Sequence, residues 1–147
     1  MKDNTVTLDK GETPAAIRFS PVFNVAVPFI DRHLEEGRAG KVAIRAADQE
    51  VTYGELTERV NRSGNALNSL GIQPGERVLM VVKDCPEFVY TFFGAIKAGV
   101  IPVPVNTMMR VSDYQYLIED SASAALIYSP EFEGTINEAL AAAAHSP

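Results

Sequence analysis

The sequence predicts an α/β protein with a largely parallel sheet that carries helices on both faces, preceded by a short antiparallel hairpin. Two observations support this fold class. Short apolar segments alternate along the chain with amphipathic helical segments, which is typical of a parallel sheet. In addition, residues 77–83 include consecutive apolar residues without alternation, which is typical of a strand buried on both faces.

The length and composition are those of one ordinary domain. The chain has 147 residues, of which 46% are hydrophobic and 22% are charged, and these values are near the averages for globular proteins. Residues 1–21 are polar with scattered proline and glycine, and we expect them to form a loose N-terminal arm. We expect residues 22–147 to form the α/β unit.

The α/β unit is expected to begin with a helix and a hairpin. Asn24 is a residue type that favours the N-cap position. Pro28 then falls in the first turn, where the missing N–H of proline removes no hydrogen bond within the helix. The helix is expected to end near Gly37. Its buried face is predicted to consist of Val25, Phe29, His33 and Leu34. Two short segments, Val42–Arg45 and Glu50–Tyr53, then predict the hairpin.

The second helix has the clearest pattern. Residues at alternating steps of four and three form one narrow stripe, which consists of Leu56, Val60, Ser63, Leu67 and Leu70. Thr52 and Glu55 have the spacing of a capping box, in which the two residues exchange hydrogen bonds at the start of a helix. Gly71 is placed to end the helix. The turn at Pro74–Gly75 then leads into the buried strand.

A third helix is expected after this strand, with Asp84 or Cys85 as its cap and Pro86 in its first turn. Its buried face is predicted to consist of Val89, Phe92, Phe93 and Ile96. Gly94 lies inside this helix, where the absence of a side chain indicates close packing against a neighbour. Gly99 ends the helix.

The next strand, Val100–Val105, contains Pro102 and Pro104. Alternate residues of a strand point their N–H groups to the same side, so both prolines remove donors from one side. The amides of Val103 and Val105 can still pair on the other side. We therefore expect an edge strand, or one whose ladder is interrupted on the proline side.

Three further elements are expected: a helix at Ser112–Ser121, a buried strand at Ala124–Tyr128, and a helix that opens at Ser129 and buries Ile136 and Leu140. Val111 and Tyr116 have the spacing of a hydrophobic staple at the start of the first of these helices. Tyr114 and Tyr116 are two residues apart, so they cannot form one stacking platform. We interpret both as packing residues.

The charge balance argues against several function classes. Lys and Arg number 13 against 19 Asp and Glu, which gives a net charge of −6 and disfavours binding to nucleic acid or to an anionic membrane surface. The sequence has no apolar run of membrane-spanning length and no signal-peptide pattern. Its single cysteine, Cys85, fits a reducing compartment, so we expect a cytoplasmic protein. From Gly99 onward Arg110 is the only basic residue, and solvated helix faces or an acidic docking surface would both explain this bias.

The search for site residues gives a mostly negative result. The glycines are too dispersed for a phosphate-binding loop. Two histidines, His33 and His145, and one cysteine cannot form a zinc set, and no histidine is obviously placed to activate Cys85. Asp84 follows a parallel strand at its C-terminal end, where open α/β sheets usually bind ligands. A phospho-acceptor or metal-binding role and a helix-capping role both fit Asp84, so no catalytic, cofactor-binding or metal-ligating residue is assigned.

Two segments nevertheless resemble motifs of adenylate-forming enzymes. Val51–Leu56, with the sequence VTYGEL, resembles the (L/V)TYxEL segment near the start of these enzymes. Ala95–Thr107, with the sequence AIKAGVIPVPVNT, resembles their xxKAGxxxVPVN motif. Gly71–Val78, between them, also fits the family pattern. The resemblance covers essentially Phe23–Ala142, and the joint spacing of the motifs makes it specific.

Within this superfamily the sequence is similar to acid–CoA ligases, and in particular to aryl-CoA ligases of the benzoate–CoA ligase type. This similarity rests on Phe23–Ala26 with Asp31–Leu34, and on Val105–Thr107 followed by Asp113–Leu117. Peptide-synthetase adenylation domains more often carry Asp where this chain has Asn106.

The resemblance implies that the chain is an N-terminal structural portion of the large N-terminal domain of such a ligase. The family activates a carboxylic acid, here an aryl acid such as benzoate, with Mg–ATP and then transfers the acyl group to CoA. Its phosphate loop, ribose-binding carboxylate and catalytic lysine lie downstream, so no functional residue is carried over. The resemblance therefore implies ATP, Mg and CoA for the full-length enzyme and none in this chain, and the 147-residue chain alone is predicted to be inactive.

The implied partners are the remainder of the same ligase and, in the full-length enzyme, a small carboxylic acid. We also expect possible self-association of the chain, because its apolar strands need cover on both faces. Two other function classes stay open from the sequence. One is a free-standing doubly wound binding or receiver-like module that uses Asp84, and the other is an interaction domain that uses the acidic last third.

Overall fold

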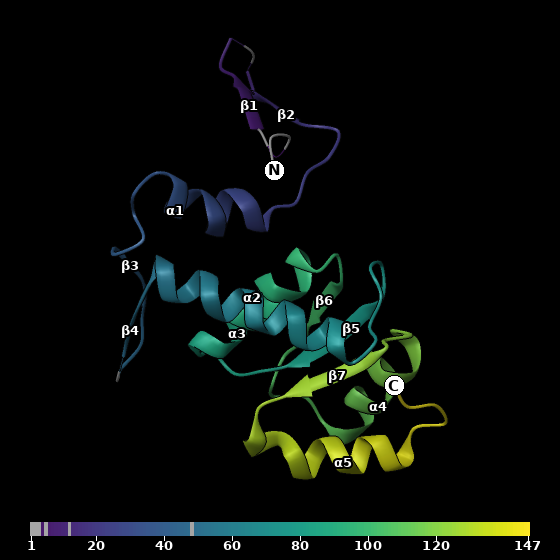
Figure 1. Cartoon of the computed structure of the whole chain (residues 1–147). Helices are drawn as coiled ribbons and strands as arrows, with labels where there is room; N and C mark the ends of the chain where they lie inside the picture. Colours follow the sequence, from purple (N-terminus) through teal and green to yellow (C-terminus); the bar gives the residue numbers. More distant parts are fainter. Residues whose placement is uncertain (1–3, 5, 12, 48) are drawn as a thin grey trace.

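A computed structural model describes residues 4, 6–11, 13–47 and 49–147. Its centre is a parallel sheet with the strand order β6-β5-β7, formed by β5 (Arg77–Val81), β6 (Ile101–Pro104) and β7 (Ala125–Tyr128). Four helices flank it: α2 (Tyr53–Ser69), α3 (Pro86–Lys97), α4 (Val111–Asp120) and α5 (Glu133–Ala142) (Figure 1). The predicted α/β fold class is confirmed.

The central strand β5 divides the core in two. Val78 and Met80 are fully buried against α2 and α3, whereas Leu79 and Val81 are fully buried against α4 and α5. Because successive side chains of a strand point to opposite faces, one short apolar strand serves both layers. Helices therefore cover both faces of the sheet, as the unalternated apolar run predicts.

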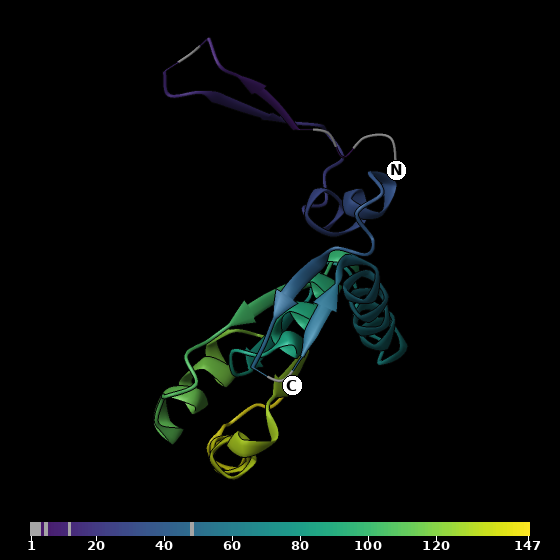
Figure 2. The ribbon, with the colours of Figure 1, turned by 90° about the vertical axis from the view of Figure 1, so that its left-hand side faces the viewer.

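The N-terminal half adds two antiparallel hairpins. The predicted hairpin forms from β3 (Val42–Arg45) and β4 (Glu50–Thr52). The loose arm expected for residues 1–21 is wrong in one respect, because it contains a second hairpin, β1 (Val6–Asp9) with β2 (Ala16–Phe19). Apolar and polar residues alternate in β1 and from Ile17 onward in β2, a local strand pattern that the polar composition of the segment hides. This hairpin stands away from the α/β body in both views (Figures 1 and 2).

The first helix differs from its prediction. It starts as a π-helix, η1 (Val27–Asp31), and continues as the short α1 (Arg32–Glu35). Pro28 lies in the first turn as predicted, and the side chain of Asn24 accepts a hydrogen bond from the Ala26 N–H (3.0 Å) just before the helix. The buried residues are Ala26 and Ile30, so the predicted buried face is wrong, and Phe29 is 59% exposed.

Contacts with α3 explain this rotation of the first helix. The Asn24 amide donates to the Ile96 carbonyl (2.8 Å), and Lys97 pairs with Asp31. Both anchors are polar and lie at the end of α3, so they turn the helix without regard to its apolar periodicity. Tertiary contacts thus override the local pattern here.

Helix α2 confirms its predicted ends. The Glu55 N–H donates to Thr52 Oγ1 (3.3 Å) and the Thr52 N–H donates to Glu55 Oε2 (2.9 Å), which is the predicted capping box. Gly71, with a φ of +85°, ends the helix. The predicted stripe is correct except at its end, because Leu70 is 75% exposed.

Helices α3, α4 and α5 show smaller corrections. In α3 the buried residues are Pro86, Tyr90, Gly94 and Ala95, and the four residues predicted to be buried are only half-buried. Helix α4 starts at Val111, after Arg110 rather than Ser112, because the Asp113 carboxylate accepts the Arg110 N–H (3.1 Å). The staple prediction is wrong, because Tyr116 is 62% exposed and Tyr114 is buried instead. In α5, which follows the 3-10 turn η2 (Pro130–Phe132), Ile136 is buried as predicted and Leu140 is half-buried.

The edge position of β6 is confirmed within the described sheet. The N–H group of Ile101 donates to the carbonyl of Glu76 (2.8 Å), directly before β5, and the N–H group of Val105 donates to the carbonyl of Met80 (3.0 Å) in β5. Pro102 and Pro104 therefore fall on the side that faces away from β5. Among the described residues, no helix is both long and apolar enough to cross a membrane.

Candidate functional site

The strand order places a candidate site at the carboxyl edge of the sheet. From β5 the chain passes through α3 to β6 on one side, and then through α4 on the opposite face to β7 on the other side. The connections thus diverge at the carboxyl ends of β5 and β7, which is where open α/β sheets usually bind ligands. Lys83 and Asp84 lie two and three residues after the end of β5, and Ser129 directly follows β7.

Lys83 and two residues after β7 link the two strand ends. The Lys83 N–H donates to the Oγ of the buried Ser129 (3.1 Å), and Lys83 Nζ lies 2.7 Å from Glu131 Oε1. This ion pair raises the pKa of Lys83 and lowers the pKa of Glu131. Sequence reasoning missed these three residues, because only the parallel pairing of β5 with β7 brings them together. Since their polar groups bind each other, they hold the strand ends together.

Asp84 is exposed and borders two hollows. One, of about 340 Å³, lies toward β3, and the other, of about 350 Å³, lies toward the end of β6; Phe88 borders both. The N-cap position of α3 belongs to Cys85. Of the two caps that the sequence allows, Cys85 is therefore confirmed and Asp84 is not the cap. The Asp84 side chain lies at the rim of two surface hollows instead.

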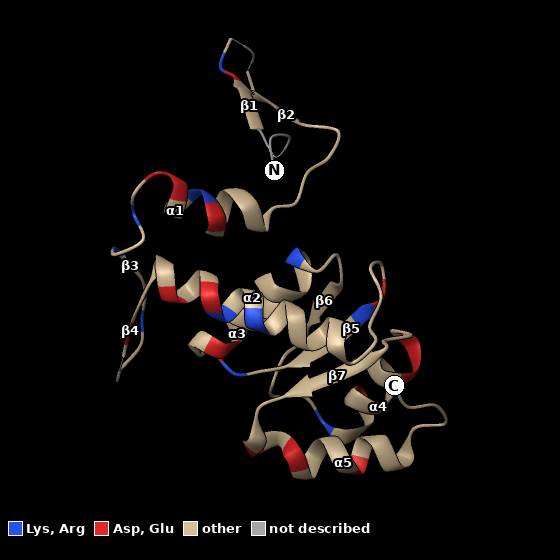
Figure 3. Ribbon diagram, in the orientation of Figure 1, with Lys and Arg blue, Asp and Glu red and all other residues tan. Residues whose placement is uncertain are grey.

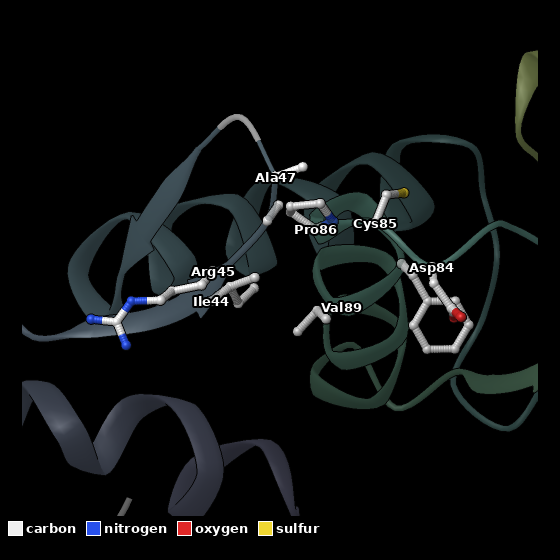
Figure 4. Close-up of a pocket in the computed structure, with 9 residues that line it drawn as sticks. Ile44, Arg45, Ala47, Asp84, Cys85, Pro86 and Val89 are labelled. Atoms are coloured by element: carbon white, nitrogen blue, oxygen red, sulfur yellow. The ribbon is translucent and has the colours of Figure 1, made fainter.

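The first hollow does not bring reactive groups together. Ile44, Pro86 and Val89 form its apolar wall, and the guanidinium of Arg45 points away from Asp84 (Figure 4). Arg45 is held by Glu50, with Nε 2.8 Å from Oε1. Burial raises the pKa of the Cys85 thiol, which disfavours the reactive thiolate. The hollow can accept an apolar group, but it offers no nucleophile paired with a base.

The second hollow contains the end of the segment Ala95–Thr107. Asn106 Oδ1 accepts the Met108 N–H (2.8 Å), and the Asn106 carbonyl accepts the hydroxyl of the buried Tyr114 (3.0 Å). Asn106 therefore shapes the turn between β6 and α4. Tyr114 is a packing residue, as expected, and the structure adds this hydrogen bond to its role.

The histidines do not complete a catalytic set. His33 stacks on Tyr53, with ring centroids 3.8 Å apart, and its Nδ1 accepts a hydrogen bond from Arg38 Nε (2.9 Å). Burial, followed by the charges of Arg38 and Arg32, lowers the pKa of His33. His145 is exposed near the end of the chain. Within the part of the chain that the structure describes, no three His, Cys, Asp or Glu residues lie close enough together to hold a metal ion.

Comparison with known proteins gives consistent results. Residues 30–146 match the family described as AMP-binding enzyme. The chain is 44% identical over 124 residues to the benzoate–CoA ligase of Thauera aromatica, and 42% identical over 123 residues to the 4-hydroxybenzoate–CoA/benzoate–CoA ligase of Rhodopseudomonas palustris. Each match covers 84% of this chain but only 24% and 23% of the relatives, so the chain spans about a quarter of their length.

Solved structures show the same relationship. A benzoate CoA ligase from Burkholderia xenovorans LB400 superimposes with a TM-score of 0.78 at 39% identity, over 83% of this chain and 24% of that chain. The N-terminal domain of FACL13 from Mycobacterium tuberculosis superimposes with a TM-score of 0.72 at 28% identity, over 84% of this chain and 31% of that one.

Proposed function

Because the chain belongs to the AMP-binding enzyme family, we propose that it forms the N-terminal structural portion of an ATP-dependent acid–CoA ligase that acts on an aryl acid such as benzoate. The observation that carries this proposal is the 44% identity to the Thauera aromatica enzyme over 84% of the chain. In such a ligase the acid carboxylate displaces pyrophosphate from ATP to form an acyl-adenylate. The thiol of CoA then displaces AMP and forms the thioester.

In this proposal the residues of this chain form part of the structural framework of the ligase and carry out no chemical step. The two hollows at Asp84 carry no phosphate-binding loop, and the described residues offer no carboxylate cluster for Mg. These residues therefore do not fit ATP, Mg or CoA by themselves, and no chemical step is assigned to them. ATP, Mg, CoA and the aryl acid belong to the proposed full-length enzyme, whose remainder is the proposed partner of this chain in a cytoplasmic ligase.

The two other function classes, a free-standing receiver-like module and an interaction domain, receive no specific support. A receiver-like module would need further acidic residues beside Asp84, and the described residues contain no such cluster. An interaction domain would need its acidic residues gathered on one surface. In the last third of the chain they are spread over α4, η2 and α5, and one of them, Glu131, is already paired with Lys83 (Figure 3).

The proposal predicts that the chain alone lacks the adenylation activity. Purified 147-residue protein should show no acid-dependent exchange of pyrophosphate into ATP above a blank without protein, because the charges that stabilise this transition state lie outside it. Measurable exchange with benzoate would contradict this prediction.

A chimera tests the structural role directly. We expect that residues 30–146 can replace the matching segment of the Thauera aromatica ligase with retention of benzoyl-CoA formation. The control is the same chimera with Gly94→Val, which should lose folded protein because the α2–α3 contact has no room for a side chain. A folded, monodisperse chimera that forms no benzoyl-CoA would overturn the proposal.

A further inference from the structure

His33 joins the first helix to the start of α2. Its ring stacks on the ring of Tyr53, the first residue of α2, with centroids 3.8 Å apart and an angle of 15° between the ring planes. Its Nδ1 accepts a hydrogen bond from Arg38 Nε (2.9 Å), and its carbonyl accepts the Arg38 N–H (2.7 Å). His33 therefore contacts both α2 and the turn formed by residues 37–41, which follows the first helix.

This turn supplies hydrogen-bond acceptors to the first residues of α2. The Ala39 carbonyl accepts the Gly54 N–H (2.9 Å), and the Lys41 carbonyl accepts the Tyr53 N–H (2.9 Å). The first N–H groups of a helix have no acceptor within the helix itself. The turn that Arg38 ties to the first helix therefore satisfies two amides that α2 leaves without an internal partner.

The ring of His33 lies among more positive than negative charge. Among the described residues, the charged groups that act on it are Arg38, Arg32 and Glu36. The Glu36 carboxylate is shared between the two arginines, because it pairs with Arg38 and lies 3.6 Å from Arg32 Nε. From α2 the group that faces the ring is the uncharged phenol of Tyr53. A positive charge on His33 thus has no carboxylate of its own.

Protonation of the ring acts on its two contacts in opposite directions. A proton on Nδ1 removes the acceptor of the Arg38 bond and sets two N–H donors against each other. The added charge strengthens the stack on Tyr53, because the face of an aromatic ring attracts a cation. Burial, and then the charge of Arg38, lower the pKa of His33, which agrees with the loss at Arg38 being the larger effect.

We propose that His33 and Arg38 form an acid-sensitive clasp, which holds residues 37–41 against the start of α2 while His33 is neutral and releases them when His33 is protonated. Histidine is the side chain whose charge normally changes between about pH 5 and 8. The clasp is closed above this transition and opens as the pH falls through the folded-state pKa of His33, which lies below 6.5. Opening leaves the amides of Tyr53 and Gly54, in the motif segment Val51–Leu56, without their acceptors.

Hydrogen exchange followed by NMR on the 147-residue chain tests the proposal. Rates are converted to protection factors, which removes the intrinsic effect of pH on exchange. From about pH 7.5 to about pH 5, the protection of the Tyr53 and Gly54 amides relative to Leu79 should fall about 2- to 10-fold, the range expected when one hydrogen bond is lost. Leu79 lies in the buried strand β5 and serves as the internal reference. A fall of the same size at Leu79 would show that the whole fold weakens, and it would overturn the proposal.

Three variants separate the clasp from other effects of acid. His33→Phe keeps a ring that can stack on Tyr53 but cannot be protonated, so the pH dependence should disappear. Arg38→Ala removes the donor, so protection at neutral pH should already be as low as in the unmodified chain at acid pH. His145→Gln, at the other histidine of the chain, is the matched control and should behave as the unmodified chain does. A pH dependence that persists in His33→Phe, or full protection of Tyr53 in Arg38→Ala, would overturn the proposal.

Discussion

At the scale of single residues, the contact between α2 and α3 depends on two glycines. A Cβ built on Gly64 would lie 2.8 Å from the Gly94 carbonyl oxygen, and one built on Gly94 would lie 2.8 Å from the Val60 carbonyl oxygen and 2.9 Å from the Gly64 nitrogen. These obstacles are backbone atoms, which cannot move without separating the helices. The sequence predicts close packing at Gly94, and the structure confirms it and identifies Gly64 as its counterpart.

Gly94→Ala should therefore destabilise the chain despite the higher helix propensity of alanine. We expect a loss of about 1–3 kcal/mol in the free energy of unfolding, measured by urea denaturation, because the added methyl group overpacks the contact. Gly134→Ala is the matched control, since nothing lies within 4 Å of its Cβ position in α5. The control should raise stability by up to about 1 kcal/mol. An equal gain at both positions would show that the two helices can separate at little cost.

His33 provides the second prediction at this scale. Its pKa is lowered first by burial and then by Arg38 and Arg32, so the folded state favours the neutral ring relative to the unfolded state. The corresponding stabilisation is complete above the unfolded pKa near 6.5 and is lost as the pH falls from there through the lower folded pKa.

An NMR titration of the His33 ring should therefore give a midpoint below 6.5 in the folded protein. Arg38→Ala should raise that midpoint, because it removes both a positive charge and the Nε–H that donates to the neutral ring. Glu36 acts in the opposite direction on the pKa of His33, so Glu36→Gln should lower the midpoint further. A midpoint that neither substitution moves would contradict this account.

At the scale of elements, helix ends follow local rules more closely than helix faces do. The ends of α2 depend on Thr52, Glu55 and Gly71, whose interactions span only a few residues. Its buried face depends on where α3 and the first helix lie, and this is why Leu70 is exposed although it fits the periodicity. A rule that involves neighbours in sequence can be applied before the fold is known, whereas burial cannot.

Thr52→Ala should cost about 1 kcal/mol in the free energy of unfolding, because the first turn of α2 loses its capping oxygen. Hydrogen bonds from Thr52 lower the pKa of Glu55, so the stabilisation from this carboxylate exists above its unfolded pKa and is lost as the pH falls through the folded value. Urea denaturation at several acidic pH values should show a weaker pH dependence in Thr52→Ala than in the unmodified chain. Ser69→Ala, in the last turn of α2, is the control and should leave that dependence unchanged.

At the scale of the whole molecule, the chain contains well-packed layers with incomplete outer cover. Tyr90 and Ala95 of α3 are buried, but Val89, Phe92, Phe93 and Ile96 around them are only half-buried. An apolar helix of this kind is usually covered on more than one side. The relatives are about three and a half times as long as this chain, and the further chain that they contain is available to supply such cover.

The isolated chain should accordingly unfold at a lower temperature than the same residues within the chimera described above. If roughly 500 Å² of apolar surface lack cover, the forgone burial is at most about 12 kcal/mol, which is comparable with the net stability of a domain. Calorimetry on the isolated chain at two concentrations separates this effect from self-association. Unfolding of the isolated chain at the temperature of the chimera would show that the segment is self-sufficient.

The sequence by itself determined the order of helices and strands from Val42 onward, the caps of α2, the burial of β5 and the proline-bearing edge of β6. Each of these follows from interactions between near neighbours or from the chemistry of one residue type, such as the missing N–H of proline. The motif segments Val51–Leu56 and Ala95–Thr107 also indicate the family without the structure, because their residues and spacing are specific in combination.

Only the tertiary structure decided which residues meet at the candidate site and which apolar side chains stay exposed. Lys83 reaches Ser129 because β5 and β7 pair in parallel, although the two residues are 46 positions apart. Asn24 and Lys97 rotate the first helix through contacts with distant residues. The strand pattern of β1 and β2 was present in the sequence, but its apolar face is exposed because the hairpin stands apart from the body. Local periodicity specifies which side of an element is apolar, whereas burial depends on the elements that pack against it.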